Sequence, residues 1–331
     1  MSRTTQRHQN SERLSVQHGD HGEQAESPRQ IPRRGWVAVT WRAWAEAKDD
    51  QVPLLAAGVA FKAFLAVFPA LTAAFLLWGI FGDTRTIVDQ VNGVAAIPTA
   101  ARQLVTDQVG QVASGKSTAG VTAVVAILLA LWSASSGVEN LMAATNLAYD
   151  EKETRGFLRR KGTALVLTVG AIVFMLLAVA FIGVVPVLVG ALGAGGAVSV
   201  VVNVLRWVLL LALVVAALAV LYRLAPDRDA PRVRWVSVGA GVATVLWLVV
   251  SAGFSLYVTV AGNSSYAKNY GAMAGVVILL MWLWLTSYAV LLGAEVNAES
   301  EKQTDVDTTV GPEEPVGRRD AVAADEKPRE R

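Results

Sequence analysis

Long apolar stretches alternate with short polar segments along most of this chain. A helix that crosses a membrane needs about 20 predominantly apolar residues, and six stretches meet that requirement. The pattern therefore predicts an all-α, polytopic membrane protein. The predicted spans are Leu54–Phe81, Thr118–Val138, Thr163–Leu192, Val198–Leu221, Val236–Ala261 and Ala272–Leu292.

The distribution of Lys and Arg predicts how these spans are oriented. Of the 29 Lys and Arg residues, 23 lie in residues 1–53, in the loops after the second and fourth spans, and in the C-terminal tail. The other three loops hold four. Cytoplasmic loops carry an excess of Lys and Arg, so an even number of spans places both termini in the cytosol. We expect the protein in a bacterial inner (plasma) membrane.

Composition agrees with a membrane location. The 331 residues are 53% hydrophobic and 17% charged, whereas soluble domains carry about 25% charged residues. The charges gather in the tails and the short loops, so the net charge of +2 describes no single surface. It gives no reason to expect a nucleic-acid partner, and membrane lipids are the expected partners.

Both ends of the chain are polar. Residues 1–35 and the acidic residues 301–331 are predicted to be disordered cytosolic tails, flanking a membrane domain at residues 36–300. Gly35–Asp50 is basic and rich in Trp, which predicts an amphipathic helix lying along the inner membrane surface. The apolar face of the predicted helix consists of Val37, Trp41, Trp44 and Ala45. The alternative is that this segment is a packed helix in the cytosol.

Residue types exclude several kinds of chemistry. The chain has no Cys, which rules out disulfides and thiolate sites. Its three His residues, His8, His18 and His21, all lie in the N-terminal tail. No cluster of acidic residues has the spacing of metal ligands. We therefore expect no catalytic residue, no metal and no cofactor, and predict that the protein is not an enzyme.

One short motif resembles a nucleotide-binding site. Gly110–Ser117 matches the P-loop pattern G-x-x-x-x-G-K-[ST], but a P-loop follows a buried strand and opens a helix on a parallel sheet. Here the preceding residues are polar and the following helix is a membrane span, so we predict a coincidental match on the outside. Apolar residues between Ile87 and Val109 recur at near-helical spacing, which predicts amphipathic helices on the outer face.

Two charged residues, Lys62 and Arg206, lie inside the predicted spans, and Glu139 directly follows the second span. A charge at membrane depth is costly and is therefore a candidate for function. Lys62 lies about 12 Å, and Glu139 about 15 Å, from the cytosolic end of their helices at the α-helical rise. The two could form an ion pair that borders a substrate path, or Lys62 could reach the inner headgroups by itself. Arg206 lies about 12 Å from the outer end of its helix. It either reaches the outer lipid phosphates or lines a pocket for an anionic headgroup.

Short runs of residues between about Trp36 and Ser300 form an ordered series. They are Leu54-Leu-Ala-Ala-Gly-Val-Ala with Phe68-Pro69; Trp132-Ser-Ala-Ser with Asn146 and Arg155; Leu221-Tyr222-Arg223 with Pro226 and Trp235; Gly239-Ala240 with Trp247, Phe254 and Tyr257; Tyr270-Gly271 with Trp282; and Leu292-Gly293-Ala294-Glu295-Val296-Asn297-Ala298-Glu299. In this order and spacing the chain resembles the YihY/BrkB family of bacterial inner-membrane proteins, once labelled ribonuclease BN.

The resemblance implies a six-helix inner-membrane protein associated with the cell envelope, and it brings no catalytic residue. Four polar residues of the series, Asn146, Arg155, Arg223 and Glu295, lie near the predicted inner face. They could gate a cytosolic opening or lock helix ends by ion pairs, and we favour the lock. The first functional hypothesis is a transporter or exporter of an amphipathic or anionic envelope compound. A non-transporting envelope scaffold is the alternative, and a membrane-associated nuclease is a remote one.

The predicted topology is testable because the chain has no Cys of its own. A single Cys at Ser199 is expected to react with a membrane-impermeant thiol reagent added to intact cells, because it lies at the outer end of the fourth span. A single Cys at Thr154 is expected to react only after the membrane is opened. Labelling of Thr154→Cys in intact cells would reverse the orientation.

Overall fold

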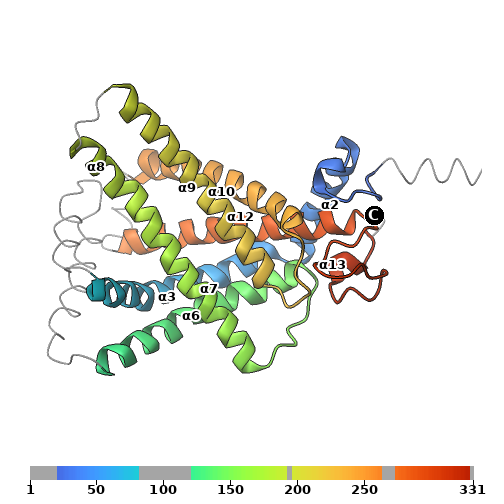
Figure 1. Ribbon diagram of the computed structural model, residues 1–331, viewed down its shortest axis with the longest axis horizontal. Helices are drawn as coiled ribbons and strands as arrows, with labels where there is room; N and C mark the ends of the chain where they lie inside the picture. Colours follow the sequence, from blue (N-terminus) through green and yellow to red (C-terminus); the bar gives the residue numbers. More distant parts are fainter. Residues whose placement is uncertain (1–20, 82–120, 192–195, 263–272, 329–331) are drawn as a thin grey trace, which may run out of the picture.

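The computed structural model describes residues 21–81, 121–191, 196–262 and 273–328. Nearly all of its regular structure is helical (Figure 1). The elements are η1 (Pro28–Gln30), α2 (Arg33–Asp49), α3 (Val52–Phe81), α6 (Val121–Ala148), α7 (Phe157–Val179), η2 (Ala180–Val184), α8 (Val185–Ala191), α9 (Ala197–Leu224), α10 (Val233–Gly262), α12 (Ala274–Lys302) and α13 (Val322–Asp325).

These helices confirm an all-α membrane protein. Five of them within the described residues are long and apolar enough to cross a membrane, and the bent pair formed by α2 and the first part of α3 gives a sixth. The predicted loop helices between Ile87 and Val109, and the Gly110–Ser117 motif, lie outside the described residues. All six predicted spans coincide with a helix, although α6 and α12 each continue ten residues further, to Ala148 and Lys302.

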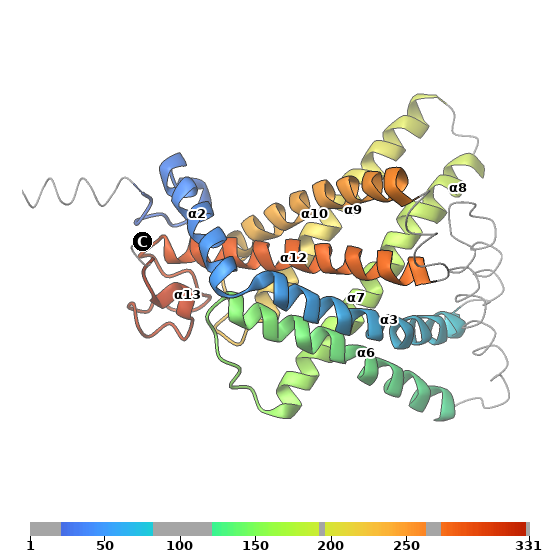
Figure 2. The same cartoon turned by 180° about the vertical axis from the view of Figure 1, so that it is seen from behind.

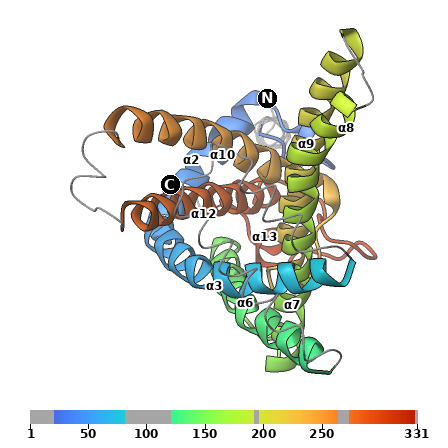
Figure 3. The same cartoon turned by 90° about the vertical axis from the view of Figure 1, so that its left-hand side faces the viewer.

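The long helices form a closed ring. Going round it, α10 contacts α12, α12 contacts α3, and the order continues through α6, α7 and α9 back to α10. Figures 1 and 2 show the helices close together at the end that holds α2 and the C-terminus, and spread apart toward the other end. Figure 3 looks along the bundle from that spread end. We call the narrow end, where residues 149–156, 225–232 and 303–328 lie, the polar end.

Two glycines form a close contact of the ring, between α10 and α12. A Cβ atom on Gly239 would overlap the backbone oxygen of Gly293. A Cβ on Gly293 would lie 2.5 Å from the hydroxyl oxygen of Tyr222 and 2.7 Å from the Cβ of Ala243. Small residues let helix backbones approach closely in membranes. Asn297 adds a polar contact, because its Oδ1 accepts the Gly239 N–H at 2.6 Å.

The N-terminal helix α2 packs on α12 and presents Trp41 and Trp44 to the outside. Trp41 is 71% exposed and Trp44 is 45% exposed. The predicted amphipathic helix is thus present, and its apolar face is free to contact the membrane surface. The axes of α2 and α3 differ by 66° at the corner between them. The buried residues of α2 are Gly35, Val39, Ala43 and Ala47.

The prediction of a disordered C-terminal tail is wrong for residues 303–328, which pack against the polar end (Figure 1). Backbone N–H groups of this segment and of residues 225–232 exchange hydrogen bonds, as in Arg232 N–H to the Thr308 oxygen at 2.8 Å. Its charged side chains find partners too, since Arg319 donates to the backbone oxygens of Ala324 and Asp305. Long-range contacts of this kind leave no trace in local composition.

The first described residues are also ordered, so the predicted disorder of residues 1–35 is wrong from residue 21 onward. The Thr304 hydroxyl donates to the Ala25 oxygen at 2.7 Å, and the Gln303 side chain donates to the His21 oxygen at 2.9 Å. Ala25 and Ile31 pack against the buried ring of Trp235. Residues 1–20 lie outside the described part of the chain.

The α10–α12 contact yields a matched pair of substitutions. Gly239→Ala is expected to lower stability by about 1–3 kcal/mol, because the new methyl group must push the two backbones apart. Gly241→Ala, two residues further on, meets nothing within 4 Å and is expected to be neutral. The thermal unfolding midpoint in detergent measures both, and equal midpoints would contradict the close contact.

Candidate functional site

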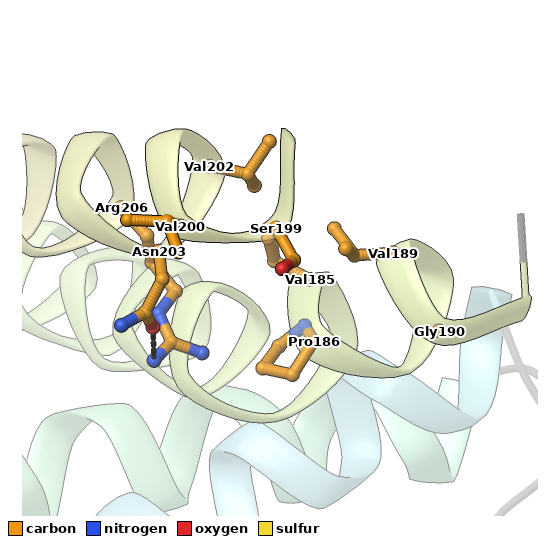
Figure 4. A pocket seen from close by; sticks show the side chains of 9 residues that line it. All are labelled: Val185, Pro186, Val189, Gly190, Ser199, Val200, Val202, Asn203 and Arg206. Carbon is orange, nitrogen blue, oxygen red and sulfur yellow. Dashed lines mark hydrogen bonds between the residues drawn. The ribbon is translucent and has the colours of Figure 1, made fainter. Parts of the chain in front are cut away.

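A pocket of about 430 Å³ opens between α8 and the first turns of α9, at the end opposite the polar end (Figures 1 and 4). One wall is mainly apolar, and Arg206 supplies the only formal charge among the lining residues. We call it the Arg206 pocket. It is lined by Val185, Pro186, Val189, Gly190, Ser199, Val200, Val202, Asn203 and Arg206.

The pocket depends on an irregular turn in the helix that faces Arg206. Between α7 and α8 the chain forms a π-helical turn, η2, and Pro186 is the second residue of α8. Pro186 has no N–H, so the Ile182 oxygen, four residues earlier, lacks the donor that an α-helix would supply. The interruption of the helix at Pro186 thus takes the form of a π turn, an irregularity that often accompanies functional sites.

The Arg206 guanidinium is only partly satisfied. Its Nη2 donates to Asn203 Oδ1 at 2.6 Å (Figure 4), and its Nη1 lies 3.5 Å from the Ile182 oxygen. The buried Nε has no hydrogen-bond partner. The guanidinium carbon lies 5.3 Å from the Trp207 ring centroid, and no acidic side chain pairs with Arg206 among the described residues. An arginine has five N–H donors, so donors remain for an additional acceptor.

Glu139 forms an ion pair with Lys161, and not with Lys62, which was expected because the two lie at similar depths in the membrane. Its Oε1 lies 3.3 Å from the Nζ of Lys161, and both side chains are largely buried. Lys161 also donates to the Trp132 oxygen at 3.3 Å and lies over the Trp132 ring. Lys62 instead carries an exposed side chain on α3, while its backbone faces Gly137 of α6. The expected Lys62–Glu139 pair is therefore replaced by Lys161–Glu139.

Two of the four residues expected at the inner face do come together. Asn146 donates to Glu153 at 3.0 Å and accepts the Asp227 N–H at 2.8 Å. Arg155 binds Glu153 at 2.7 Å and lies 3.5 Å from Asp227. The Arg155 hydrogen bond lowers the pKa of Glu153. Burial opposes ionisation of Asp227, but hydrogen bonds from Thr154 and the charge of Arg155 outweigh it, so the pKa of Asp227 is lowered as well.

The other two residues do not join that group. Arg223 is half-buried on the last turn of α9, and no ion pair involves it among the described residues. Glu295 is 2% exposed on α12, and its Oε1 has no hydrogen-bond partner. Asn146 and Arg155 therefore hold helix ends together, as one of the two predictions for these residues states. Glu295 does not, because it is buried and has no ion pair among the described residues.

The polar end also contains a buried ion pair that the sequence did not reveal. Arg228 Nη2 lies 2.7 Å from Glu301 Oε2, and both side chains are fully buried. The Thr308 hydroxyl donates to the same carboxylate at 2.7 Å, and the Arg228 guanidinium lies over the Tyr149 ring. Helical spacing past Leu292 was the available signal, because Asn297 and Glu301 fall on one face of a continuing α12.

Glu151, in the segment that follows α6, contacts α13 within the polar end. Its Oε1 accepts the Val322 N–H at 2.7 Å. Burial raises the pKa of Glu151 to about 7, although this hydrogen bond works in the opposite direction. No group of three or more His, Asp or Glu side chains in the described part of the chain is arranged to hold a metal ion.

Sequence comparisons give this chain a family context. A model of the family described as "Virulence factor BrkB" matches residues 43–318. The "Putative ribonuclease-like protein YfkH" of Bacillus subtilis is 34% identical over 182 residues, which cover 54% of this chain and 65% of that protein. A "UPF0761 membrane protein" of Alteromonas mediterranea is 44% identical over 79 residues, covering 24% of this chain and 26% of that protein. A similarly named protein of Vibrio parahaemolyticus is 41% identical over 99 residues, or 30% of each chain.

The chain spans less than two thirds of the length of each of these relatives. No solved structure gives a significant match to it. The printed names describe a ribonuclease-like protein in one case and membrane proteins in the others, so they assign no substrate.

The Lys161–Glu139 pair can be tested against the rejected one. Lys161→Met is expected to lower the free energy of unfolding by about 3 kcal/mol, because it leaves the Glu139 carboxylate buried without its cation. Combining it with Glu139→Gln is expected to restore most of that loss. Lys62→Met, the matched control, is expected to change stability by less than about 0.5 kcal/mol. If Lys62→Met and Glu139→Gln instead had non-additive effects on the free energy of unfolding, Lys62 rather than Lys161 would be the partner of Glu139.

Proposed function

Because the chain belongs to the BrkB virulence factor family of membrane proteins, we propose that it is a transporter or exporter of an anionic, envelope-related amphiphile. In this proposal it lies in the bacterial inner membrane with both termini in the cytosol, so that the Arg206 pocket opens in the outer half of the membrane. The observation that carries the proposal is the partly satisfied guanidinium in that pocket.

The charge of Arg206 indicates an anionic ligand. A cation at membrane depth is costly and normally has a partner, yet the described residues offer Arg206 only neutral acceptors. The planar guanidinium matches phosphate and carboxylate groups in a bidentate geometry. A ligand that brings such a group would supply the missing partner for the charge.

The walls of the pocket indicate that the ligand also has an apolar part. Ser199, Asn203 and Arg206 provide its polar side, and valines of α8 and α9 provide the rest (Figure 4). Its volume of about 430 Å³ falls within the range of small-molecule sites, about 300–1,000 Å³. A phosphate-bearing lipid headgroup with the first part of its chains fits this combination.

Transport also requires that the site can change shape. The π turn and Pro186 interrupt the hydrogen-bond ladder between α7 and α8, and such interruptions are where helices bend. The helices nearest the pocket are those that spread apart most in Figure 1. This arrangement supports movement at the pocket end of the bundle relative to the polar end.

A non-transporting envelope scaffold is the second candidate. It is favoured by the polar end, where the Arg228–Glu301 pair and the ordered C-terminal segment join four separate parts of the chain. A scaffold requires no ligand movement, so the two candidates differ in a vesicle assay. The ribonuclease-like name belongs to the Bacillus protein, and we propose no nuclease chemistry for this chain.

The test is binding and movement of lipids by the purified protein. Wild-type protein is expected to retain a phosphatidylglycerol probe in native mass spectrometry. Arg206→Met is expected to weaken retention about tenfold or more, because hydrogen bonds to charged groups contribute about 1.5–3 kcal/mol. Arg206→Lys is expected to recover part of the affinity, since it keeps the charge and loses the bidentate geometry.

Three controls separate the possible explanations. Lys62→Met removes another cation from a predicted span and is expected to leave retention unchanged. A phosphatidylcholine probe tests the need for net negative charge, and inorganic phosphate tests the need for the acyl chains. In vesicles, an impermeant reductant reports whether a labelled anionic lipid changes leaflets; retention without movement would favour the scaffold, and equal retention by Arg206→Met would reject the site.

A further inference from the structure

Glu295 is a buried carboxyl group without a cation. It lies on α12 at the polar end, is 2% exposed, and has an oxygen with no hydrogen-bond partner. A buried carboxylate is strongly disfavoured unless it is paired or hydrogen-bonded. The charge state of Glu295 therefore depends on what its neighbours offer.

The nearby cations already serve other carboxylates. Lys302 Nζ lies 2.9 Å from Asp150 and 3.0 Å from Glu299. Arg42 Nε lies 2.7 Å from the other oxygen of Glu299. Neither Glu295 nor its neighbour Asp50 has an ion pair among the described residues. Four carboxyl groups thus share two cations, and the two that remain are Glu295 and Asp50.

Asp50 lies at the C-terminal cap of α2, in the corner between α2 and α3. The corner is formed at Gln51, whose φ of 53° is uncommon for a residue other than glycine. Burial first, and then the charge of Asp50, disfavour ionisation of Glu295. Asp50 is half-buried rather than fully buried, so it is more accessible to water than Glu295. Burial and the charge of Asp150 raise the pKa of Asp50 to about 6.

We propose that Glu295 and Asp50 form a proton-binding site, in which Glu295 carries the proton at neutral pH and Asp50 exchanges it with water. The ligand is a proton rather than a metal ion, because no group of acidic side chains in the described residues is arranged to hold a metal. Binding converts one carboxylate and one solvent proton into a neutral carboxylic acid. This inference does not rest on the proposed transport function.

The proton joins the corner between α2 and α3 to α12. When it leaves, two carboxylates at Glu295 and Asp50 repel each other, and separation of the corner from α12 relieves that repulsion. The other charged and titratable groups around the site are Arg42, Glu46 and Asp49 of α2, Tyr149 and Asp150 after α6, and Glu299 and Lys302 of α12.

Infrared spectroscopy of the full-length protein in lipid bilayers tests the protonation state directly. At about pH 8.5, above the titration range of Glu151 and Asp50, the wild type is expected to show the carbonyl stretch of a protonated carboxyl group, and Glu295→Gln is expected to remove it. Glu313→Gln changes an exposed carboxylate of the same type and is expected to leave the band intact. A band that persists in Glu295→Gln, or its absence from the wild type, would overturn the proposal.

Stability as a function of pH provides a second measurement. A carboxyl group that is protonated in the folded protein stabilises it below the ordinary titration range of Glu, and this contribution disappears as the pH rises. The wild type is therefore expected to lose more of its thermal midpoint than Glu295→Gln between about pH 6 and about pH 9. Below about pH 4, where Glu is protonated in the unfolded chain as well, the two are expected to unfold at similar temperatures, because Gln mimics the neutral acid. A large loss for Glu295→Gln at neutral pH would instead show an ionised, structurally paired Glu295.

Discussion

The contact between Gly239 and Gly293 determines the positions of much of the remaining structure. It brings α10 and α12 together more closely than side chains would allow, and it places Asn297 of α12 against the backbone of α10. The Tyr222 hydroxyl of α9 donates to the Val290 oxygen at 2.6 Å beside the same crossing. Because α12 then continues to Lys302, this crossing also positions the charged residues that organise the polar end.

The two ends of the bundle differ in whether their charged side chains have partners within the chain. At the polar end, buried carboxylates and cations are paired within the chain, as in Arg228 with Glu301, and Glu295 is the exception. At the other end, Arg206 keeps unused donors beside an apolar wall. A protein that binds a ligand at one end and holds the other end fixed needs this contrast, because binding requires groups that folding has left unpaired.

Hydropathy located all six membrane helices, because about 20 apolar residues in a row have few alternatives to a spanning helix. The apolar spans that it located end at Val138 and Leu292, whereas α6 and α12 continue to Ala148 and Lys302. Helix continuation beyond the lipid needs no apolar residues, since the protein itself buries Asn146, Asn297 and Glu301. The order of the C-terminal segment was missed for a similar reason: its contacts join residues far apart in the chain.

Depth along a helix followed from the sequence, but direction around the helix did not. Helical rise placed Lys62 and Glu139 at similar depths, and only packing showed that Glu139 faces α7 and Lys161. In the same way, Asn146 and Arg155 meet while Glu295 lies among other carboxylates. The sequence by itself determined how many helices cross the membrane and which charges lie within them, because burial in lipid selects residue type. Tertiary structure decided which charges meet, because that depends on the rotation and crossing of helices from distant parts of the chain.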